Sequence, residues 1–404
     1  MRWVCPRVIR GNRGDLLSRW GILSALHRLG VSHVTVFCAR ERHVPDGPFR
    51  LLPYGRVYNL LPGWYGWRAL WRSDVVLWTG GLDLQDDSSL AKLVHTFLLF
   101  GIYRAIGLRI IVVMQGAGPL TRGSGRWLAR HILNLVSLFV ARDPRSRALL
   151  GGLGALARLD QGSDGIFLDG FDDDLHVPPA EGRFVSGIVA RRPGQPVIGI
   201  NVRLWFHFAS SWVPYQFAKK RYQARATARM ARVLDNLMEA IAALRCRHGA
   251  RIVLLSMYEP GTEPWEDDLP LLRALKERFA ADEDVVVIED DLSIPGFYRL
   301  VSRLNLVIGM RLHSTLAAIR AGVPAIHISY TDKGRDIFRA LGLGDLVVEL
   351  GEFMDDPAPV IDKAARVLKD SDLRARIIAV RDETIQRNRT VLSESLAWIQ
   401  AEGR

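Results

Sequence analysis

Short apolar runs alternate with stretches of helical periodicity along the first part of the chain, and this alternation determines the predicted architecture. A short apolar run bounded by turn residues is typical of a buried strand. Strands that are separated by helices form a parallel sheet covered on both faces. The predicted strands are Trp3–Ile9, His33–Cys38, Asp74–Trp78, Arg109–Met114 and Ser137–Ala141, and the predicted helices are Leu16–Leu29, Ser88–Ile106, Gly125–Leu135 and Pro144–Gly151.

The pattern breaks near the middle of the chain and then restarts. Residues 177–195 are rich in Pro, Gly and Arg and lack strong periodicity, which predicts a linker. Long helices are predicted within Ala224–Arg247 and from Ser371 to near the end. Further strands are predicted at Val197–Val202, Ile252–Ser256, Val285–Ile288, Leu306–Gly309, Ala325–Tyr330 and Leu346–Leu350. We therefore predict an α/β protein with two Rossmann-like parallel-sheet domains, residues 1–176 and 196–404, in a GT-B-like arrangement with a ligand cleft between them.

The segment 304–333 contains the most informative pattern, a predicted strand, turn, helix and second strand. Ligands of parallel α/β sheets bind beyond the carboxyl ends of the strands. Arg311, His313 and Ser314 follow the first of these strands, and Lys333 follows the second. The N-terminus of a helix at Ser314–Arg320 adds partial positive charge, and histidine titrates near neutrality. This edge is therefore predicted to bind an anion. The structural alternatives are that Ser314 caps a helix, that Arg311 forms a surface ion pair and that His313 is a buried histidine with satisfied hydrogen bonds.

Three other strand ends carry polar side chains that are predicted to face the same cleft. Asn201 and Arg203 end the first strand of the second half, and arginine pairs carboxylate or phosphate groups through two parallel bonds. The turn Gly11-Asn12-Arg13-Gly14-Asp15 and the segment 79–87 supply glycines and carboxylates. In these two segments the predicted substrate-binding residues are Asn12, Gly80 and Gly81. The predicted bases are Asp15 and Asp83, and Asp86 is an alternative base. The structural alternative for these carboxylates is that they cap helices.

Composition narrows the partners without identifying them. The chain of 404 residues has a net charge of +11, which favours acidic partners. It contains no nucleic-acid-binding motif and no cysteine spacing typical of a metal site or disulfide framework, so a reducing, cytoplasmic location is predicted. No secretory signal is expected, and Phe97–Met114 is interrupted by Arg104 and Arg109 and is too short to span a membrane. The aromatic stretch 61–78, which includes Arg68 and Arg72, is predicted either to touch a membrane interface or sugar rings, or to pack onto the core.

Six motifs, in order along the chain, resemble those of the polysaccharide pyruvyl transferase family. The strongest is Gly309-Met310-Arg311-Leu312-His313-Ser314, followed by Ile328-Ser329-Tyr330 and Lys333. Ser163-Asp164-Gly165-Ile166-Phe167 stands where the family has an Ala-Asp-Pro-Ala-Phe-like segment, and Leu82 stands where it has a third glycine. The other similar segments are Gly11-Asn12-x-Gly14-Asp15, Gly80-Gly81-x-Asp83-x-Gln85-Asp86, Gln115-Gly116-Ala117-Gly118-Pro119-Leu120, Ala141-Arg142-Asp143-x-x-Ser146 and Ile200-Asn201-Val202-Arg203.

The resemblance implies transfer of pyruvate from phosphoenolpyruvate to a sugar as a cyclic ketal, without a metal or other cofactor. His313 would be the general acid, and Arg311, Arg203 and Lys333 would bind the donor anion. The first domain would be the acceptor side, and the acceptor would be a sugar or lipid-linked glycan, with possible peripheral membrane contact and no nucleic acid. A GT-B glycosyltransferase that uses a nucleotide sugar, with Glu349 or Glu352 at the ribose, is the first alternative. A non-catalytic polyanion-binding protein is the second.

Overall fold

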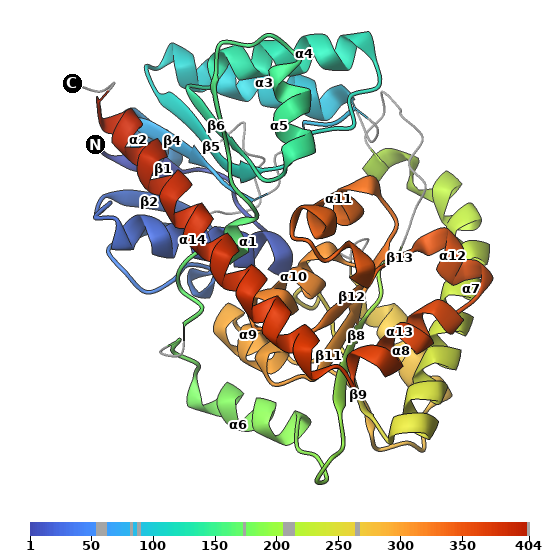
Figure 1. Ribbon diagram of the computed structural model, residues 1–404. Helices are drawn as coiled ribbons and strands as arrows, with labels where there is room; N and C mark the ends of the chain where they lie inside the picture. The colour runs from blue at the N-terminus through green and yellow to red at the C-terminus, as the bar shows by residue number, and fades with distance from the viewer. Residues whose placement is uncertain are drawn as a thin grey trace.

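The computed structural model describes residues 1–53, 63–80, 84–86, 90–172, 175–204, 215–262 and 267–401, and it describes side chains of the helix 215–248 only from residue 229 onward. Two parallel sheets with helices on both faces form the molecule (Figure 1). The prediction of a two-sheet α/β protein is thus confirmed. Among the described helices, none is both long and apolar enough to cross a membrane.

The first sheet has seven parallel strands in the order β3-β2-β1-β4-β5-β6-β7. Its central strands are buried along their whole length, as expected for a parallel sheet covered on both faces. The strands are β1 Trp3–Cys5, β2 Val34–Cys38, β3 Phe49–Pro53, β4 Val75–Trp78, β5 Arg109–Gln115, β6 Leu138–Ala141 and β7 Arg158–Gln161, and the helices are α1 Arg13–Arg28, α2 Trp64–Trp71, α3 Leu90–Ala105, α4 Gly123–Leu135 and α5 Pro144–Gly151, with short 3₁₀ helices η1 Glu41–His43 and η2 Gly165–Phe167.

The second sheet has six parallel strands in the order β10-β9-β8-β11-β12-β13. Strands β8, β11 and β12 form its buried centre, so the loops that follow them meet at one edge. The strands are β8 Val197–Asn201, β9 Arg251–Leu254, β10 Val285–Val287, β11 Leu306–Gly309, β12 Ala325–Ser329 and β13 Val347–Glu349, and the helices are α7 Tyr215–His248, α8 Leu269–Arg278, α9 Ile294–Ser302, α10 Leu312–Arg320, α11 Asp332–Ala340, α12 Leu350–Asp355, α13 Ala358–Val367 and α14 Ser371–Ala401, with the 3₁₀ helix η3 Gly344–Leu346.

Several predicted boundaries shift for local reasons. The predicted strand Trp3–Ile9 ends at Cys5, because Pro6 has no N–H to donate to a neighbouring strand. Helix α1 begins at Arg13, three residues before its predicted start, because the Asn12 side chain accepts bonds from the Gly14 and Asp15 amides and caps it. Helix α10 begins at Leu312, so His313 lies inside its first turn and Ser314 does not cap it.

The predicted linker between the sheets contains a helix that its composition did not indicate. Residues 177–195 contain helix α6, Pro179–Ile188, which begins with the proline that often occupies the first turn of a helix. The chain then returns to the first sheet at its end. Helix α14 runs from the second sheet back to the first (Figure 1), where Leu392, Leu396 and Ile399 join the core under β1, β4 and β5.

Candidate functional site

His313 lies where the two halves of the molecule meet. It belongs to the first turn of α10, directly beyond β11 of the second sheet. Across the boundary, α1 of the first half presents Gly14 to the imidazole ring. A Cβ atom at Gly14 would lie 2.6 Å from His313 Nδ1, so any larger residue would displace the ring. This close approach explains the glycine in the Gly11-Asn12-x-Gly14-Asp15 motif.

A buried carboxylate faces the other nitrogen of the ring. His313 Nε2 lies 3.3 Å from Asp164 Oδ2, and Asp164 in turn lies 3.5 Å from the Nη1 atom of Arg142. The side chain of Asp164 is 1% exposed, whereas that of His313 is 19% exposed. Burial by itself would raise the pKa of Asp164, but His313 and Arg142 outweigh it and hold that pKa well below its usual range. The site therefore contains a fixed negative charge beside a partly exposed imidazole.

Arg311 differs most from its predicted role as a ligand on a loop edge. The residue is 8% exposed, and its guanidinium forms two parallel bonds with Asp268, Nε to Oδ2 at 2.9 Å and Nη2 to Oδ1 at 2.7 Å. The group also lies over the Tyr258 ring, 4.5 Å from its centroid. Because Asp268 is fully buried, this is an internal ion pair. Arg311 is therefore assigned a positioning role at the start of α10.

Asn201 and Ser314 belong to the same internal network. Asn201 is fully buried, and its Oδ1 accepts a bond of 3.1 Å from the Arg311 amide while its Nδ2 donates to Leu255 O. The fully buried Ser314 hydroxyl donates to Arg311 O at 2.6 Å. Both side chains therefore hold the loop that carries Arg311, and their predicted contact with the substrate stays a prediction.

Two other predicted cations stand at the edge of the second sheet and are half-buried. Arg203 follows β8, donates to the Tyr330 hydroxyl and lies over the Tyr330 ring. Lys333, in the first turn of α11, donates to the side-chain oxygen of Gln85 in the first half. Lys333 therefore spans the two halves, as His313 does.

The predicted groups of the first half have more structural contacts than expected. The Asn12 turn pairs with the loop after β9, because the Arg13 amide donates to Met257 O and the Glu259 amide to Gly11 O. Asn12 itself caps α1 through its side-chain oxygen, and its predicted contact with the substrate stays a prediction. Asp15 lies 3.6 Å from Arg7 and remains partly exposed.

Gly80 has the positive φ of 69° that favours glycine, and it packs against Asp15. Gly81 and Asp83 lie outside the described residues. Asp86 is fully buried and accepts bonds from the Thr121 and Arg122 amides, so it fixes the entry to α4, in agreement with the structural alternative.

Sequence reasoning missed Asp164, Arg142 and Gln85 as site residues, although each lies in a quoted motif. It also missed Asn388 of α14, which is fully buried. The Asn388 Oδ1 accepts from the Ser163 amide at 2.7 Å, and Nδ2 donates to Asp164 O and Phe167 O at 3.0 and 3.1 Å. One amide side chain therefore fixes both ends of the loop that carries Asp164.

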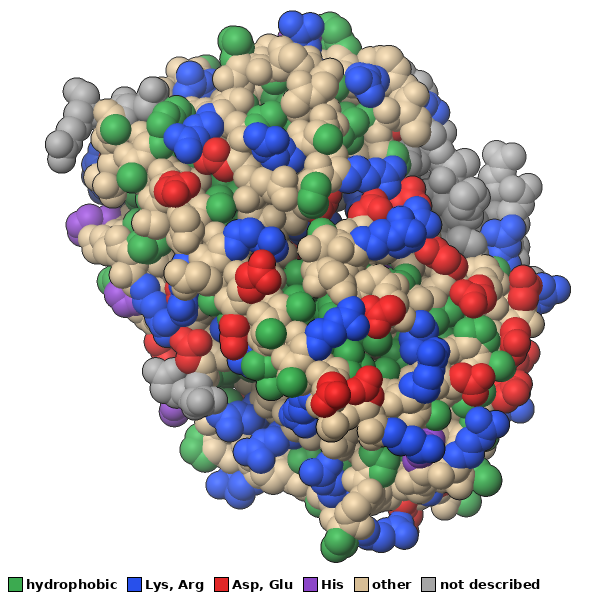
Figure 2. Space-filling view, in the orientation of Figure 1, with side chains coloured by type: hydrophobic (Ala, Val, Ile, Leu, Met, Phe, Trp, Pro, Cys, Tyr) green, Lys and Arg blue, Asp and Glu red, His purple; other side chains and the backbone are tan. Residues whose placement is uncertain are grey.

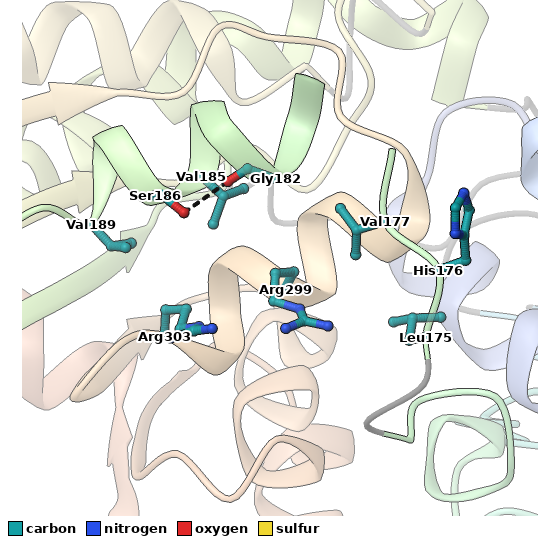
Figure 3. Close-up of a pocket in the computed structure, with 9 residues that line it drawn as sticks. All are labelled: Leu175, His176, Val177, Gly182, Val185, Ser186, Val189, Arg299 and Arg303. Atoms are coloured by element: carbon teal, nitrogen blue, oxygen red, sulfur yellow. Dashed lines mark hydrogen bonds between the residues drawn. The ribbon is translucent and has the colours of Figure 1, made fainter. Parts of the chain in front are cut away.

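A surface cavity of about 620 Å³ lies away from this site, between α6 and α9 (Figure 3). Arg299 of α9 and Arg303, directly after α9, line one side of it, and Val185 and Ser186 of α6 line the other, with Val189 directly after α6. It contains none of the predicted site residues. Among the described residues, no group of three or more His, Cys, Asp or Glu side chains is arranged to hold a metal ion.

Comparison with known proteins agrees with this architecture. A family model described as polysaccharide pyruvyl transferase matches residues 12–332. The chain is similar to the UDP-GlcNAc 2-epimerase of Methanocaldococcus jannaschii, with a TM-score of 0.57, 13% identity and coverage of 92% of this chain and 94% of that one. The corresponding enzyme of Neisseria meningitidis, bound to UDP-GlcNAc, gives a TM-score of 0.57, 11% identity and coverage of 98% and 100%. Anabaena HepE in complex with UDP-glucose gives a TM-score of 0.54 and 14% identity, and the match covers 99% of this chain and 98% of that one. At these identities the likeness concerns the fold alone, and it confirms the GT-B-like arrangement.

Proposed function

The chain belongs to the polysaccharide pyruvyl transferase family, and we propose that it transfers pyruvate from phosphoenolpyruvate to a sugar of a polysaccharide or its precursor, forming a cyclic ketal. The observation that carries the proposal is the His313–Asp164 pair, with Arg142 beside it, at the junction of the two halves. A partly exposed imidazole held by a buried carboxylate is the arrangement that a general acid needs.

The proposed reaction requires one proton donor and several cations. A sugar hydroxyl attacks C2 of phosphoenolpyruvate while C3 takes a proton. The bond from C2 to the phosphate oxygen then breaks, phosphate leaves with the electron pair, and a second hydroxyl attacks C2 to close the ketal and releases its proton. His313 supplies the proton to C3 or to the leaving phosphate. Asp164 orients the imidazole, because its Oδ2 atom lies 3.3 Å from His313 Nε2.

The donor carries a carboxylate and a phosphate, and Arg142, Arg203 and Lys333 are the cations assigned to them. Arg142 lies beside the pair, and its buried Nε atom, 4.0 Å from Asp143 Oδ2, has no hydrogen-bond partner among the described residues. Arg203 follows β8 and Lys333 follows β12, two strands of the second sheet that flank β11. Arg311 is already neutralised by Asp268 and acts by holding the first turn of α10. Asp15 is the described candidate for the base that accepts the hydroxyl proton, and Asp83 is the other sequence candidate.

Ligand-dependent thermal stability tests the donor directly. Phosphoenolpyruvate is expected to raise the melting temperature, since a ligand at about 100 times its Kd adds about 2.7 kcal/mol to the stability of the folded protein. Free UDP and UDP-sugars are expected to do so less. Inorganic phosphate and pyruvate serve as controls for each half of the donor. If a UDP-sugar raised the melting temperature more than phosphoenolpyruvate does, the protein would instead be assigned as a glycosyltransferase. If any polyanion raised it and no turnover were detected, a polyanion-binding protein would be favoured.

Asn388 allows the loop of Asp164 to be disturbed from a distance. Asn388→Leu removes the three bonds to residues 163–167 at similar side-chain volume, and turnover is expected to fall about 10–100-fold, as for other residues that orient a reacting group. The KM for phosphoenolpyruvate should change little. Hydrogen exchange at the Ser163 amide should accelerate, and this measurement does not depend on activity.

Ser395→Ala is the matched control for Asn388→Leu. Ser395 is also buried on α14 and donates to Asp160 at the end of β7, 3.1 Å away, but it does not touch residues 163–167. It should lower stability slightly and leave turnover near wild type. Equal losses of turnover in both variants would mean that α14 supports the fold only.

A further inference from the structure

Helices α2, α3 and α4 form one layer on the first sheet. The connections β3-α2-β4, β4-α3-β5 and β5-α4-β6 all cross the sheet in the same direction, and right-handed crossovers place such helices on the same face. The inner residues Leu70, Phe100 and Ile132, one from each helix, share a single apolar core. Contact between Phe97 of α3 and His131 of α4, with ring centroids 6.5 Å apart, continues the layer outward. The three helices therefore present a common outer surface.

That outer surface combines large exposed apolar side chains with basic ones. Trp64 is 67% exposed and Tyr65 is 72% exposed, both on α2. We use the name α2–α4 surface for a set of exposed aromatic, leucine, lysine and arginine side chains on these helices. They are Trp64, Tyr65, Arg68, Trp71, Lys92, Leu98, Arg126, Trp127 and Arg130, with Arg72 at the end of α2. Figure 2 shows Lys and Arg side chains with apolar groups between them along the top of the view, where α3 and α4 lie.

The charge of this layer is one-sided. Residues 63–73 and 88–142 contain Lys and Arg but no Asp or Glu, although the chain as a whole has 43 acidic residues. Elsewhere acidic and basic residues alternate, as along α14, whose sequence includes Asp372, Asp382 and Glu383 among its arginines. Local electrostatics at the α2–α4 surface are therefore uniformly attractive to anions.

We propose that the α2–α4 surface docks the protein on an anionic membrane surface. Trp and Tyr favour the boundary between headgroups and acyl chains, and arginine can keep its charge among phosphates while its stem covers apolar surface. Exposed aromatic and leucine side chains distinguish this surface from a site for a soluble polyanion, which would need the cations alone. No helix enters the membrane, and attraction of each basic residue to anionic lipid supplies the binding.

The position of the layer connects docking to the site. Each of these helices follows a strand and therefore starts at the carboxyl edge of the first sheet, the edge on which Gly80, Arg142 and Asp164 lie. Trp64 and Tyr65 begin α2 at that edge. The link between docking and the site rests on the proposed function: a membrane at the α2–α4 surface would bring a lipid-linked glycan toward that carboxyl edge.

Vesicle flotation tests this docking without using the enzymatic reaction. The full chain is mixed at low salt with phosphatidylcholine vesicles that contain or lack phosphatidylglycerol. Binding is expected only with the anionic lipid and should decrease at high salt, because screening weakens surface attraction. Arg126→Gln combined with Arg130→Gln should weaken binding about thirty-fold, at about fivefold per residue. Trp64→Ser combined with Tyr65→Ser should also weaken it.

The matched control removes the same number of charges elsewhere. Arg374 and Arg387 are exposed on α14, and their double replacement by Gln should leave flotation unchanged. Circular dichroism verifies that every variant is folded. The proposal is overturned if anionic vesicles are not bound at low salt, or if the control pair loses as much binding as the α4 pair. Equal affinity for a soluble polyanion such as heparin, with no effect of the aromatic replacements, would overturn it in favour of a polyanion site.

Discussion

Replacement of His313 by glutamine is expected to lower turnover by about 10²–10⁴-fold, the usual effect of removing a general acid. Glutamine keeps a hydrogen-bonding group opposite Asp164 but cannot deliver a proton to C3 of the donor. Binding of phosphoenolpyruvate should persist, because the assigned cations Arg142, Arg203 and Lys333 are unchanged. Calorimetry of donor binding and phosphate release should be measured on the same preparation.

His33→Gln provides the control, since His33 is exposed and lies at the opposite end of β2 from the site. It should bind and turn over like the wild type. Loss of both binding and turnover in His313→Gln would make His313 a ligand of the donor only. Unchanged turnover would refute its assignment as the acid.

Arg311→Ala is expected to destabilise the protein by about 3–5 kcal/mol, because breaking a buried ion pair leaves Asp268 uncompensated. This differs from the expectation for a residue on an exposed loop, whose removal would leave the fold intact. Turnover of the fraction that still folds should also be low, since the first turn of α10 carries His313. Chemical unfolding and activity should be compared at a temperature where the variant remains folded.

A surface pair supplies the comparison. Arg335 lies 3.2 Å from Glu349, and both side chains are substantially exposed, so Arg335→Ala should cost less than about 1 kcal/mol. The double replacement Arg311→Met and Asp268→Leu should recover much of the stability that Arg311→Ala loses, because no lone charge remains buried. If it restores stability without activity, the ion pair positions the site. If Arg311→Ala lowered the free energy of unfolding by no more than Arg335→Ala does, the internal role given to Arg311 would be contradicted.

Apolar periodicity predicted the central strands well, because burial on both faces imposes an almost continuous hydrophobic sequence. Strand β7 escaped prediction since Arg158-Leu159-Asp160-Gln161 contains one apolar residue and lies at the sheet edge. That omission also concealed Asp164, which follows β7 and would otherwise have been placed at the carboxyl edge. Strand β3 was also missed; it is apolar enough, but it lies at the other edge of the sheet, is only partly buried and ends in Pro53.

The sequence predicted which strand ends carry the candidate site residues, but it did not predict which side chains contact one another. His313 was identified because it follows a buried strand beside a helix start. Its partner Asp164 lies 149 residues earlier, and no local pattern reports a pairing over that separation. Whether Arg311 binds a ligand or an internal carboxylate depended on Asp268, which precedes α8 and carries no recognisable signal of its own.

The return of α14 to the first sheet constrains how members of this family can be recombined. A chimera that joins one parent's residues before β8 to another parent's residues after it would separate Asn388 from the loop that it holds. The chimera would also pack one parent's Leu392, Leu396 and Ile399 against core residues of the other parent. Exchange of the first sheet between relatives therefore requires two crossovers, one before β8 and one near Ser371, so that this sheet keeps its own final helix.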